Sequence, residues 1–214
     1  MYLEHFLRAQ DYLSRHGLKP RVVMGSPVSE RDLRASDAST DFPMPLELRQ
    51  FYLELGDGFA FLPDEGDTSH LVGWDYMHLA DHKIWNNGFG GAIEEEAMRE
   101  IEQPSPRTNP ELLKQEMARR KRWMPFYGFV GGGDVLCLDL NMSPPAVRFY
   151  EAQVWTALPH RWDFVLAASF TEFVERWSRY HLLSPSGGWT SFCRERAGLF
   201  DWAPEHFPRV DAPK

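Results

Sequence analysis

The segment from Pro45 to Gly58 (PLELRQFYLELGDG) constrains the fold more than any other part of the chain. Its apolar residues recur at i, i+3, i+4 and i+7, which places them on one face of a helix. They are Leu48, Phe51, Tyr52 and Leu55. Proline favours the start of a helix, and Gly56 and Gly58 supply the backbone freedom that favours its end. The segment therefore predicts a helix whose apolar face packs on a core.

Outside the middle of the chain, two further helices are predicted, one early and one late. The first runs from Tyr2 to about His16, with apolar residues on one face and Gly17 after its end. The second begins at Ser169, which forms a capping box with Glu172. Between the first helix and the proline-led helix, the sequence predicts a loop that three prolines interrupt. These are Pro20, Pro27 and Pro43.

Strand patterns fill the middle of the chain. Short strands are predicted at residues 59–63 and at about 70–77. MPFYGFV (124–130) and VLCLDL (135–140) are joined by a glycine-rich turn, which is a hairpin signal, and AVRFYEA (146–152) predicts a third strand. Helices first, strands in the middle and a helix after them predict an α+β fold with a mostly antiparallel sheet.

Residues 79–122 depart from this core pattern. The stretch is polar, and its first helical pattern has a thin apolar edge before two prolines interrupt it. A new helix is predicted from Asn109, with Pro110 in its first turn. We therefore predict one domain over residues 1–183, with residues 79–122 as a polar helical insertion. Residues 184–214, rich in proline and aromatic side chains, are predicted to be an extension packed on this domain.

The charge of the chain favours a protein partner over a nucleic acid. The net charge is −8 over 214 residues, whereas non-specific nucleic-acid binding needs a basic field. Between Gln50 and His82 the chain carries seven acidic residues and no lysine or arginine. These are Glu54, Asp57, Asp64, Glu65, Asp67, Asp75 and Asp81. Such a surface attracts a cationic partner, although an ordinary solvated loop has the same composition.

Two shorter charge runs lie in the predicted insertion. Arg119 to Arg122 is a basic run at the end of a predicted helix, where cations complement the helix dipole. The alternative is contact with an acidic partner or with the acidic region of the chain itself. Glu94, Glu95 and Glu96 lie in the first turn of another predicted helix, where the dipole favours acids. An interaction patch is the alternative there.

No residue pattern indicates catalysis. Asp134 and Asp139 are five positions apart, so in one extended strand they point to opposite faces, which disfavours an acid/base pair. The glycines before Asp134 are not followed by the lysine and helix of a phosphate-binding loop. His78 and His82 have a spacing that can hold a metal ion on a helix, but no clear third ligand accompanies them. We predict no enzyme activity, cofactor or metal, with small-ligand or metal binding at the histidines as an alternative.

The remaining features predict a soluble cytoplasmic protein. The charged start (MYLEHFLRAQDYL) lacks the apolar core of a signal peptide, and the apolar run FVLAA before the last helix is too short to span a bilayer. Cys137 and Cys193 form no C-x-x-C pair. Because Cys137 lies in an apolar strand, we expect a buried, reduced thiol there, with a disulfide to Cys193 as the alternative.

Three segments, taken in order, resemble the SUKH superfamily. The proline-led helix Pro45–Gly58 ends in a small glycine-rich turn. A strand led by Trp123 follows, then the step Gly133–Asp134 and an apolar strand that ends at Leu138–Leu140. The last match is the helix opening Ser169–Phe173. The predicted insertion and the aromatic tail depart from the family pattern.

This resemblance implies an α+β fold without enzymatic activity and a role in binding other proteins. The superfamily includes fungal cell-wall-assembly regulators and bacterial immunity proteins that bind and block a toxin, often a nuclease or a deaminase. We therefore expect an immunity protein whose acidic surface, with Trp74 as an aromatic anchor, binds a basic toxin. The predicted partner-binding residues are Asp57, Asp64, Glu65, Asp67, Trp74, Asp75, Asp81, Glu94, Glu95 and Glu96. The alternative is a regulatory scaffold that binds several host proteins.

Overall fold

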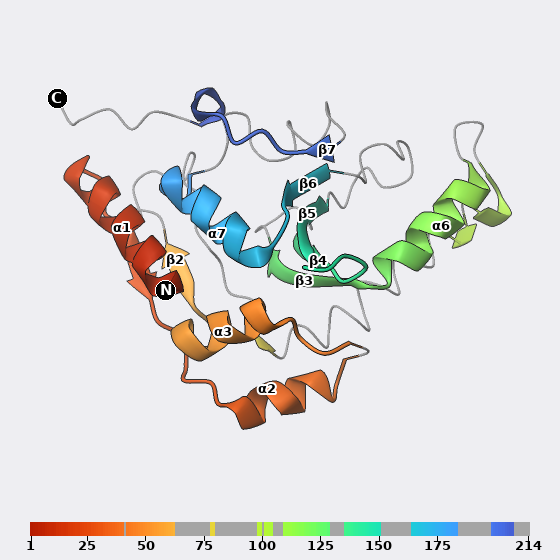
Figure 1. The fold of residues 1–214 in the computed structure, drawn as a ribbon, viewed down its shortest axis with the longest axis horizontal. Helices are drawn as coiled ribbons and strands as arrows, with labels where there is room; N and C mark the ends of the chain where they lie inside the picture. The colour runs from red at the N-terminus through yellow and green to blue at the C-terminus, as the bar shows by residue number, and fades with distance from the viewer. Residues whose placement is uncertain are drawn as a thin grey trace.

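The computed structural model describes residues 1–40, 42–62, 78–79, 98–99, 101–104, 109–128, 135–150, 164–183 and 198–207, arranged as in Figure 1. Its helices are α1 (Tyr2–Arg15), α2 (Glu30–Asp37), α3 (Leu46–Leu55), α6 (Pro110–Arg120), α7 (Phe170–Arg179) and the short 3-10 helix η3 (Pro204–His206). Its strands are β1 (Arg21–Val23), β2 (Ala60–Leu62), β3 (Trp123–Gly128), β4 (Val135–Asp139), β5 (Ala146–Tyr150), β6 (Phe164–Ala167) and β7 (Gly198–Leu199).

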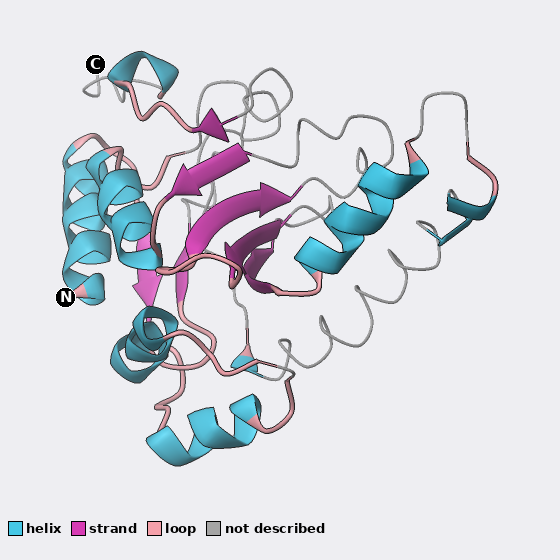
Figure 2. Cartoon of the chain, turned by 45° about the vertical axis from the view of Figure 1, so that its right-hand side comes forward, coloured by secondary structure: helices cyan, strands magenta, loops and turns pink. Residues whose placement is uncertain are grey.

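The strands form two sheets (Figure 2). β1 pairs antiparallel with β2, and the larger sheet has the order β3-β4-β5-β6-β7. The first four strands of the larger sheet are antiparallel, and β7 runs parallel to β6. Helices come before and after these strands in the chain, so the predicted α+β fold with a mostly antiparallel sheet is confirmed.

The elements with strong local signals form where the sequence predicts them. α3 begins after Pro45 and ends at Gly56, whose φ of 87° is a conformation that glycine adopts without strain. The Ser169 side chain accepts a hydrogen bond from the Glu172 amide and so caps α7. Asn109 caps α6 in the same way, with Pro110 in the first turn. The predicted strand at 70–77 and the glycine-rich turn at 131–134 lie outside the described residues.

The loop predicted between α1 and α3 is wrong, because this region contains β1 and α2. α2 is eight residues long and buries one side chain, that of Leu33, so it has no periodic apolar stripe. Its start is a capping box of Ser29 and Asp32, with aspartate in place of the usual glutamate. The two short strands β6 and β7 were not predicted either, since β6 is a brief apolar run without alternation.

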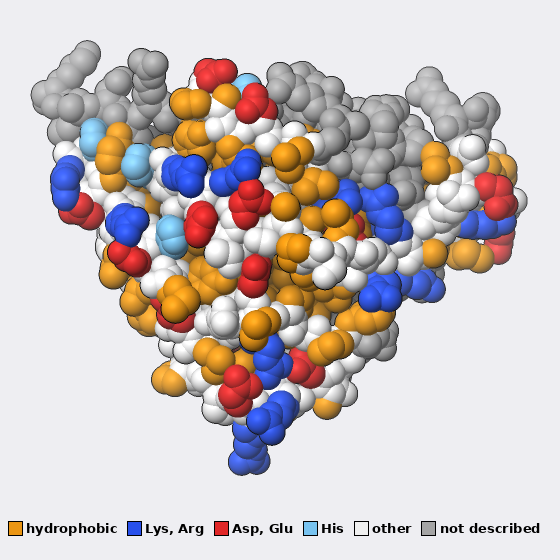
Figure 3. All heavy atoms as spheres, viewed as in Figure 1, with side chains coloured by type: hydrophobic (Ala, Val, Ile, Leu, Met, Phe, Trp, Pro, Cys, Tyr) orange, Lys and Arg blue, Asp and Glu red, His pale blue; other side chains and the backbone are white. Residues whose placement is uncertain are grey.

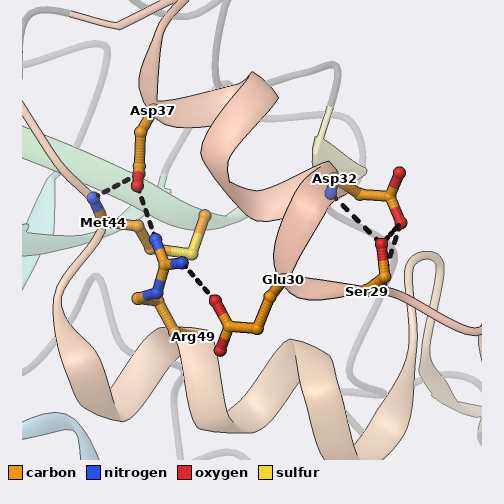
Figure 4. Close-up of polar contacts among 6 residues, drawn as sticks. All are labelled: Ser29, Glu30, Asp32, Asp37, Met44 and Arg49. Atoms are coloured by element: carbon orange, nitrogen blue, oxygen red, sulfur yellow. Dashed lines mark hydrogen bonds and ion pairs between the residues drawn. The ribbon is translucent and has the colours of Figure 1, made fainter.

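Arg49 of α3 holds α2 in place (Figure 4). Its guanidinium donates to Glu30 Oε2 at 2.7 Å and to the Asp37 carboxylate, so one side chain binds both ends of α2. The other oxygen of Asp37 accepts from the Met44 amide at 2.8 Å. These contacts replace the apolar face that α2 lacks.

The core lies between the larger sheet and α1, α3 and α7. α7 contributes its whole apolar stripe, in which Phe170, Phe173 and Trp177 are fully buried. The Phe170 ring has edge contacts with Phe51 of α3 at 5.3 Å and with Phe126 of β3 at 5.1 Å. Such edge-to-face pairs are the preferred geometry of aromatic rings. α7 therefore joins the N-terminal helices to the sheet.

α1 and α7 start side by side, and two glutamates of α3 bind their N-termini. The Tyr2 hydroxyl lies 2.9 Å from the Thr171 hydroxyl, so the first turns of the two helices are adjacent. Glu54 accepts from the Tyr2 and Leu3 amides at 3.0 and 2.9 Å. Glu47 accepts from the Thr171 amide at 3.0 Å. Adjacent helix N-termini carry like partial charges, and the two carboxylates of α3 offset them.

Replacing Glu54 by alanine is expected to lower the free energy of unfolding by about 1–2 kcal/mol, since two helix amides lose their acceptor. Urea denaturation of the purified protein measures this loss. The matched control is Glu4→Ala, because the Glu4 side chain is 62% exposed and pairs with Arg8 in the same helix. A change within about 0.5 kcal/mol is expected for the control. Equal losses in both variants would contradict the capping role.

Residues 198–207 pack beside α7 at its C-terminal end. The Phe207 ring stacks on Tyr180 at 3.8 Å, and Phe200 and Phe207 are buried. The Trp202 indole donates to the Leu166 carbonyl at 2.7 Å, and the Tyr180 hydroxyl donates to the Trp202 carbonyl. The division of the chain into a domain over 1–183, an insertion over 79–122 and an extension over 184–214 stays a prediction.

Candidate functional site

Asp57 is the one predicted partner-binding residue that the structure describes. It follows the Gly56 end of α3, where its backbone forms two hydrogen bonds of 2.8 Å with Ser26. Its side chain is 29% exposed, lies 3.3 Å from His78 Nδ1 and accepts from the Leu79 amide at 2.8 Å. The carboxylate therefore fixes residues 78–79 to the end of α3 and keeps only part of its surface for another molecule.

The other predicted partner-binding residues lie outside the described part of the chain. They are Asp64, Glu65, Asp67, Trp74, Asp75, Asp81, Glu94, Glu95 and Glu96. The role of all ten residues stays a prediction.

The structure describes two of the four residues that the sequence offered for catalysis or metal binding, namely His78 and Asp139. His82 and Asp134 lie outside the described residues. Among the residues that the structure describes, no group of three His, Cys, Asp or Glu side chains could hold a metal ion. Asp139 is 1% exposed and accepts a hydrogen bond of 2.6 Å from Arg148 Nε. This carboxylate therefore stabilises the pairing of the strands, and its burial prevents contact with a substrate.

One hollow of about 580 Å³ lies between α1 and α7. Figure 3 shows this face, on which acidic, basic and histidine side chains alternate over the two helices. His5 Nδ1 lies 2.9 Å from the Ser178 hydroxyl. Nearer the C-terminal end of α1, the Tyr12 ring stacks on the His181 ring at a centroid distance of 3.4 Å. The two contacts join α1 to α7 and to the residues just after it, and all four residues line the hollow. No sequence pattern indicated these contacts.

His181 makes the stability of this helix pair depend on pH. Burial, and secondarily the charge of His16, lower the pKa of His181 from 6.5 to about 4. The folded protein therefore excludes a proton that the unfolded chain binds, and stability is lost as the pH falls from about 6.5 to about 4. Because the ring is half-buried, we expect a loss of about 1–2 kcal/mol instead of the full value of the shift.

Urea denaturation at pH 7 and at pH 4 checks this expectation, with His181→Asn as the matched variant. Asparagine tolerates the left-handed backbone of this position, where φ is 55°. The variant should lose less stability than the wild type between the two pH values, because it lacks the titrating ring. The same loss in both proteins would contradict the prediction.

A second cluster covers the sheet face that is turned away from α7. Cross-strand pairing sets Trp123 opposite Asp139 and Cys137 opposite Arg148. The neighbouring residues Met124, Leu138 and Val147 belong to the core, so alternation puts the first four on the outer face. Burial raises the pKa of the Cys137 thiol well above its ordinary range, and Arg120 opposes this effect less strongly. The expected buried, reduced thiol is therefore present at Cys137.

Trp123 is the centre of this outer face. The guanidinium carbons of Arg119, Arg120 and Arg148 each lie 5.6 Å from the centroid of its ring. We call these four residues the Trp123 cluster. Trp123 is 8% exposed, and its indole nitrogen is buried with no hydrogen-bond acceptor among the described residues. A buried donor left in this state costs about 1–3 kcal/mol.

The sequence contained part of the signal for this cluster. The run Arg119–Arg122 drew attention to two of its cations, which lie at the C-terminal end of α6 as predicted. Arg148 carried no signal, because an arginine in an alternating strand is expected to face water. Only the pairing of β4 with β5 sets Arg148 beside Asp139 and Trp123.

Comparison with known protein families gives a match to this chain. The model of the SMI1 / KNR4 family (SUKH-1) matches residues 27–176 of this chain. Curated proteins give no match. The matched region begins before α2 and ends within α7, so it includes β2 to β6 and leaves out α1, β1 and β7. None of the described helices is both long and apolar enough to cross a lipid bilayer.

Proposed function

Because the chain belongs to the SMI1 / KNR4 family (SUKH-1), we propose that it is a non-catalytic binding protein that neutralises a cognate toxin by direct contact. The family match over residues 27–176 is the observation that carries the proposal. The matched region contains every residue of the predicted partner-binding set, from Asp57 to Glu96. The protein acts in the cytoplasm and requires no cofactor.

The partner is a basic protein domain, of the kind found in nucleases. The acidic residues between Gln50 and His82, with no lysine or arginine among them, give that part of the chain a single sign of charge. A surface of one sign accelerates the encounter with a domain of the opposite sign. Trp74 lies within the same stretch, and a tryptophan at the centre of an interface supplies a large share of the binding free energy.

The first experiment is a pull-down from lysate of the native host with this protein as bait, read by mass spectrometry. One dominant partner with a basic, toxin-like domain supports neutralisation of a toxin. Several unrelated host proteins support a regulatory scaffold. If no protein partner is captured, both the toxin-neutralising role and the scaffold role are contradicted. Binding of a small ligand is then the next hypothesis to test.

Association kinetics with the captured partner then test the acidic surface. Reversal of charge at Asp64, Glu65 and Asp67 should lower the association rate constant by about tenfold or more at low salt. The matched control reverses three exposed acids outside the acidic stretch, Glu111, Glu175 and Glu205, and so changes the net charge equally. Equal rate constants for both variants would show that net charge, and not this surface, guides the partner.

A further inference from the structure

The Trp123 cluster contains a buried hydrogen-bond donor that none of the described residues satisfies. Trp123 is more than nine-tenths buried, and its indole N–H has no acceptor in the part of the chain that the structure describes. Buried donors in folded proteins are almost always paired, with an ordered water or an ion where protein atoms are absent. Arg119, Arg120 and Arg148 have further contacts of their own, so the indole N–H is the donor that calls for a ligand.

The surroundings of this donor specify the charge of the ligand. Three guanidinium groups lie 5.6 Å from the ring centroid, and the indole nitrogen is part of that ring. Asp139 already accepts from Arg148 Nε and from the amide and side chain of Asn141, so its oxygens are engaged. A group that accepts from an indole N–H amid arginines carries negative charge on oxygen.

We propose that the Trp123 cluster binds an oxyanion, either a phosphate or a carboxylate group. The ligand oxygen accepts a hydrogen bond from the Trp123 indole N–H, and the guanidinium groups of Arg119 and Arg120 balance its charge. Arg148 stays bound to Asp139 and forms the floor of the site. The site lies on the sheet face opposite α7, and the proposed toxin-binding role does not use it.

Two-dimensional NMR of the ¹⁵N-labelled full chain tests the proposal directly. The chain has eight tryptophans, each with one indole N–H signal, and the Trp123 signal is assigned by its loss in Trp123→Phe. Titration with sodium phosphate, at constant ionic strength set with sodium chloride, should move this signal in a saturable manner while the others stay in place. A parallel titration with sodium acetate distinguishes a phosphate site from a carboxylate site.

Two arginines of the same run provide matched variants. Arg120→Gln removes a guanidinium next to Trp123 and should raise the apparent dissociation constant by about tenfold. Arg122→Gln removes the same charge from the same run, but the Arg122 guanidinium lies over a different ring, that of Phe42, at 4.9 Å. It should bind the anion as the wild type does.

Thermal denaturation gives a second readout that does not require the Trp123→Phe variant to fold. Phosphate or acetate should raise the melting temperature of the wild type and of Arg122→Gln more than that of Arg120→Gln. Two results overturn the proposal. One is a Trp123 signal that moves no further than the other indole signals with either anion, which would leave an ordered water as the acceptor. The other is equal weakening by the two arginine variants, which would indicate unspecific charge attraction.

Discussion

Replacing Gly56 by alanine is expected to lower the free energy of unfolding by about 3–5 kcal/mol. Gly56 has φ 87° and ψ 171°, a backbone conformation that is essentially confined to glycine. A Cβ atom there would lie 2.6 Å from the backbone of Gly25 and Ser26. These backbone atoms cannot move aside, because Gly25 donates to the Leu55 carbonyl and Ser26 pairs with Asp57 in both directions. The variant therefore combines backbone strain with a steric clash.

Gly17→Ala is the matched control for this prediction. Gly17 also has a positive φ, of 83°, at the end of α1. Alanine there should lose about 1 kcal/mol, the usual cost of a left-handed backbone in a residue with a side chain. Denaturation in urea measures both variants. If Gly56→Ala loses no more than Gly17→Ala, the close crossing of the two backbone segments is not what makes Gly56 necessary.

Replacing Arg148 by methionine is expected to destabilise the protein by about 3–5 kcal/mol, because it leaves a buried charge without its partner. The side chains of Arg148 and Asp139 are 9% and 2% exposed, and Arg148 Nε lies 2.6 Å from Asp139 Oδ2. Asn141 donates two further hydrogen bonds to the same carboxylate, at 3.1 and 2.8 Å. These bonds alone do not compensate for the burial of an ionised group.

The double variant Arg148→Met with Asp139→Asn separates the buried charge from the lost packing. Asparagine keeps an oxygen for Asn141 and carries no charge, so the double variant should be more stable than Arg148→Met alone. The free energies of unfolding of the wild type, both single variants and the double variant form a complete cycle. If the double variant is no more stable than Arg148→Met, loss of arginine packing accounts for the destabilisation.

The sequence alone was sufficient where the stabilising contacts are local. The stripe Leu48–Leu55 predicted α3, and Ser169 predicted the start of α7, because helix periodicity and caps act between residues three or four positions apart. The patterns that predicted β4 and β5 are local as well, because they depend on residues one or two positions apart. The sequence did not predict α2, because the contacts that hold this helix in place come from Arg49, which is 19 positions after Glu30.

The candidate sites could be predicted from the sequence only in part, because their contacts join distant segments. The acidic stretch and the basic run were visible as composition, and the family resemblance rested on short motifs within single elements. Composition did not indicate that the Asp57 carboxylate would bind residues 78–79 of its own chain. It also did not indicate that Arg119, Arg120 and Arg148 would surround Trp123. Each of these depends on which segments meet in space.

The amino-acid sequence by itself determined the helices with apolar stripes, the antiparallel strands and the sign of the charge, because each is a property of neighbouring residues. The packing of distant segments determined why Gly56 must be glycine, which carboxylates bind the starts of α1 and α7, and where Trp123 lies. Glu47 and the Thr171 amide are 124 positions apart, yet the hydrogen bond between them is 3.0 Å long. Loops of that length leave no periodic trace in a sequence, so only the folded chain reveals such contacts.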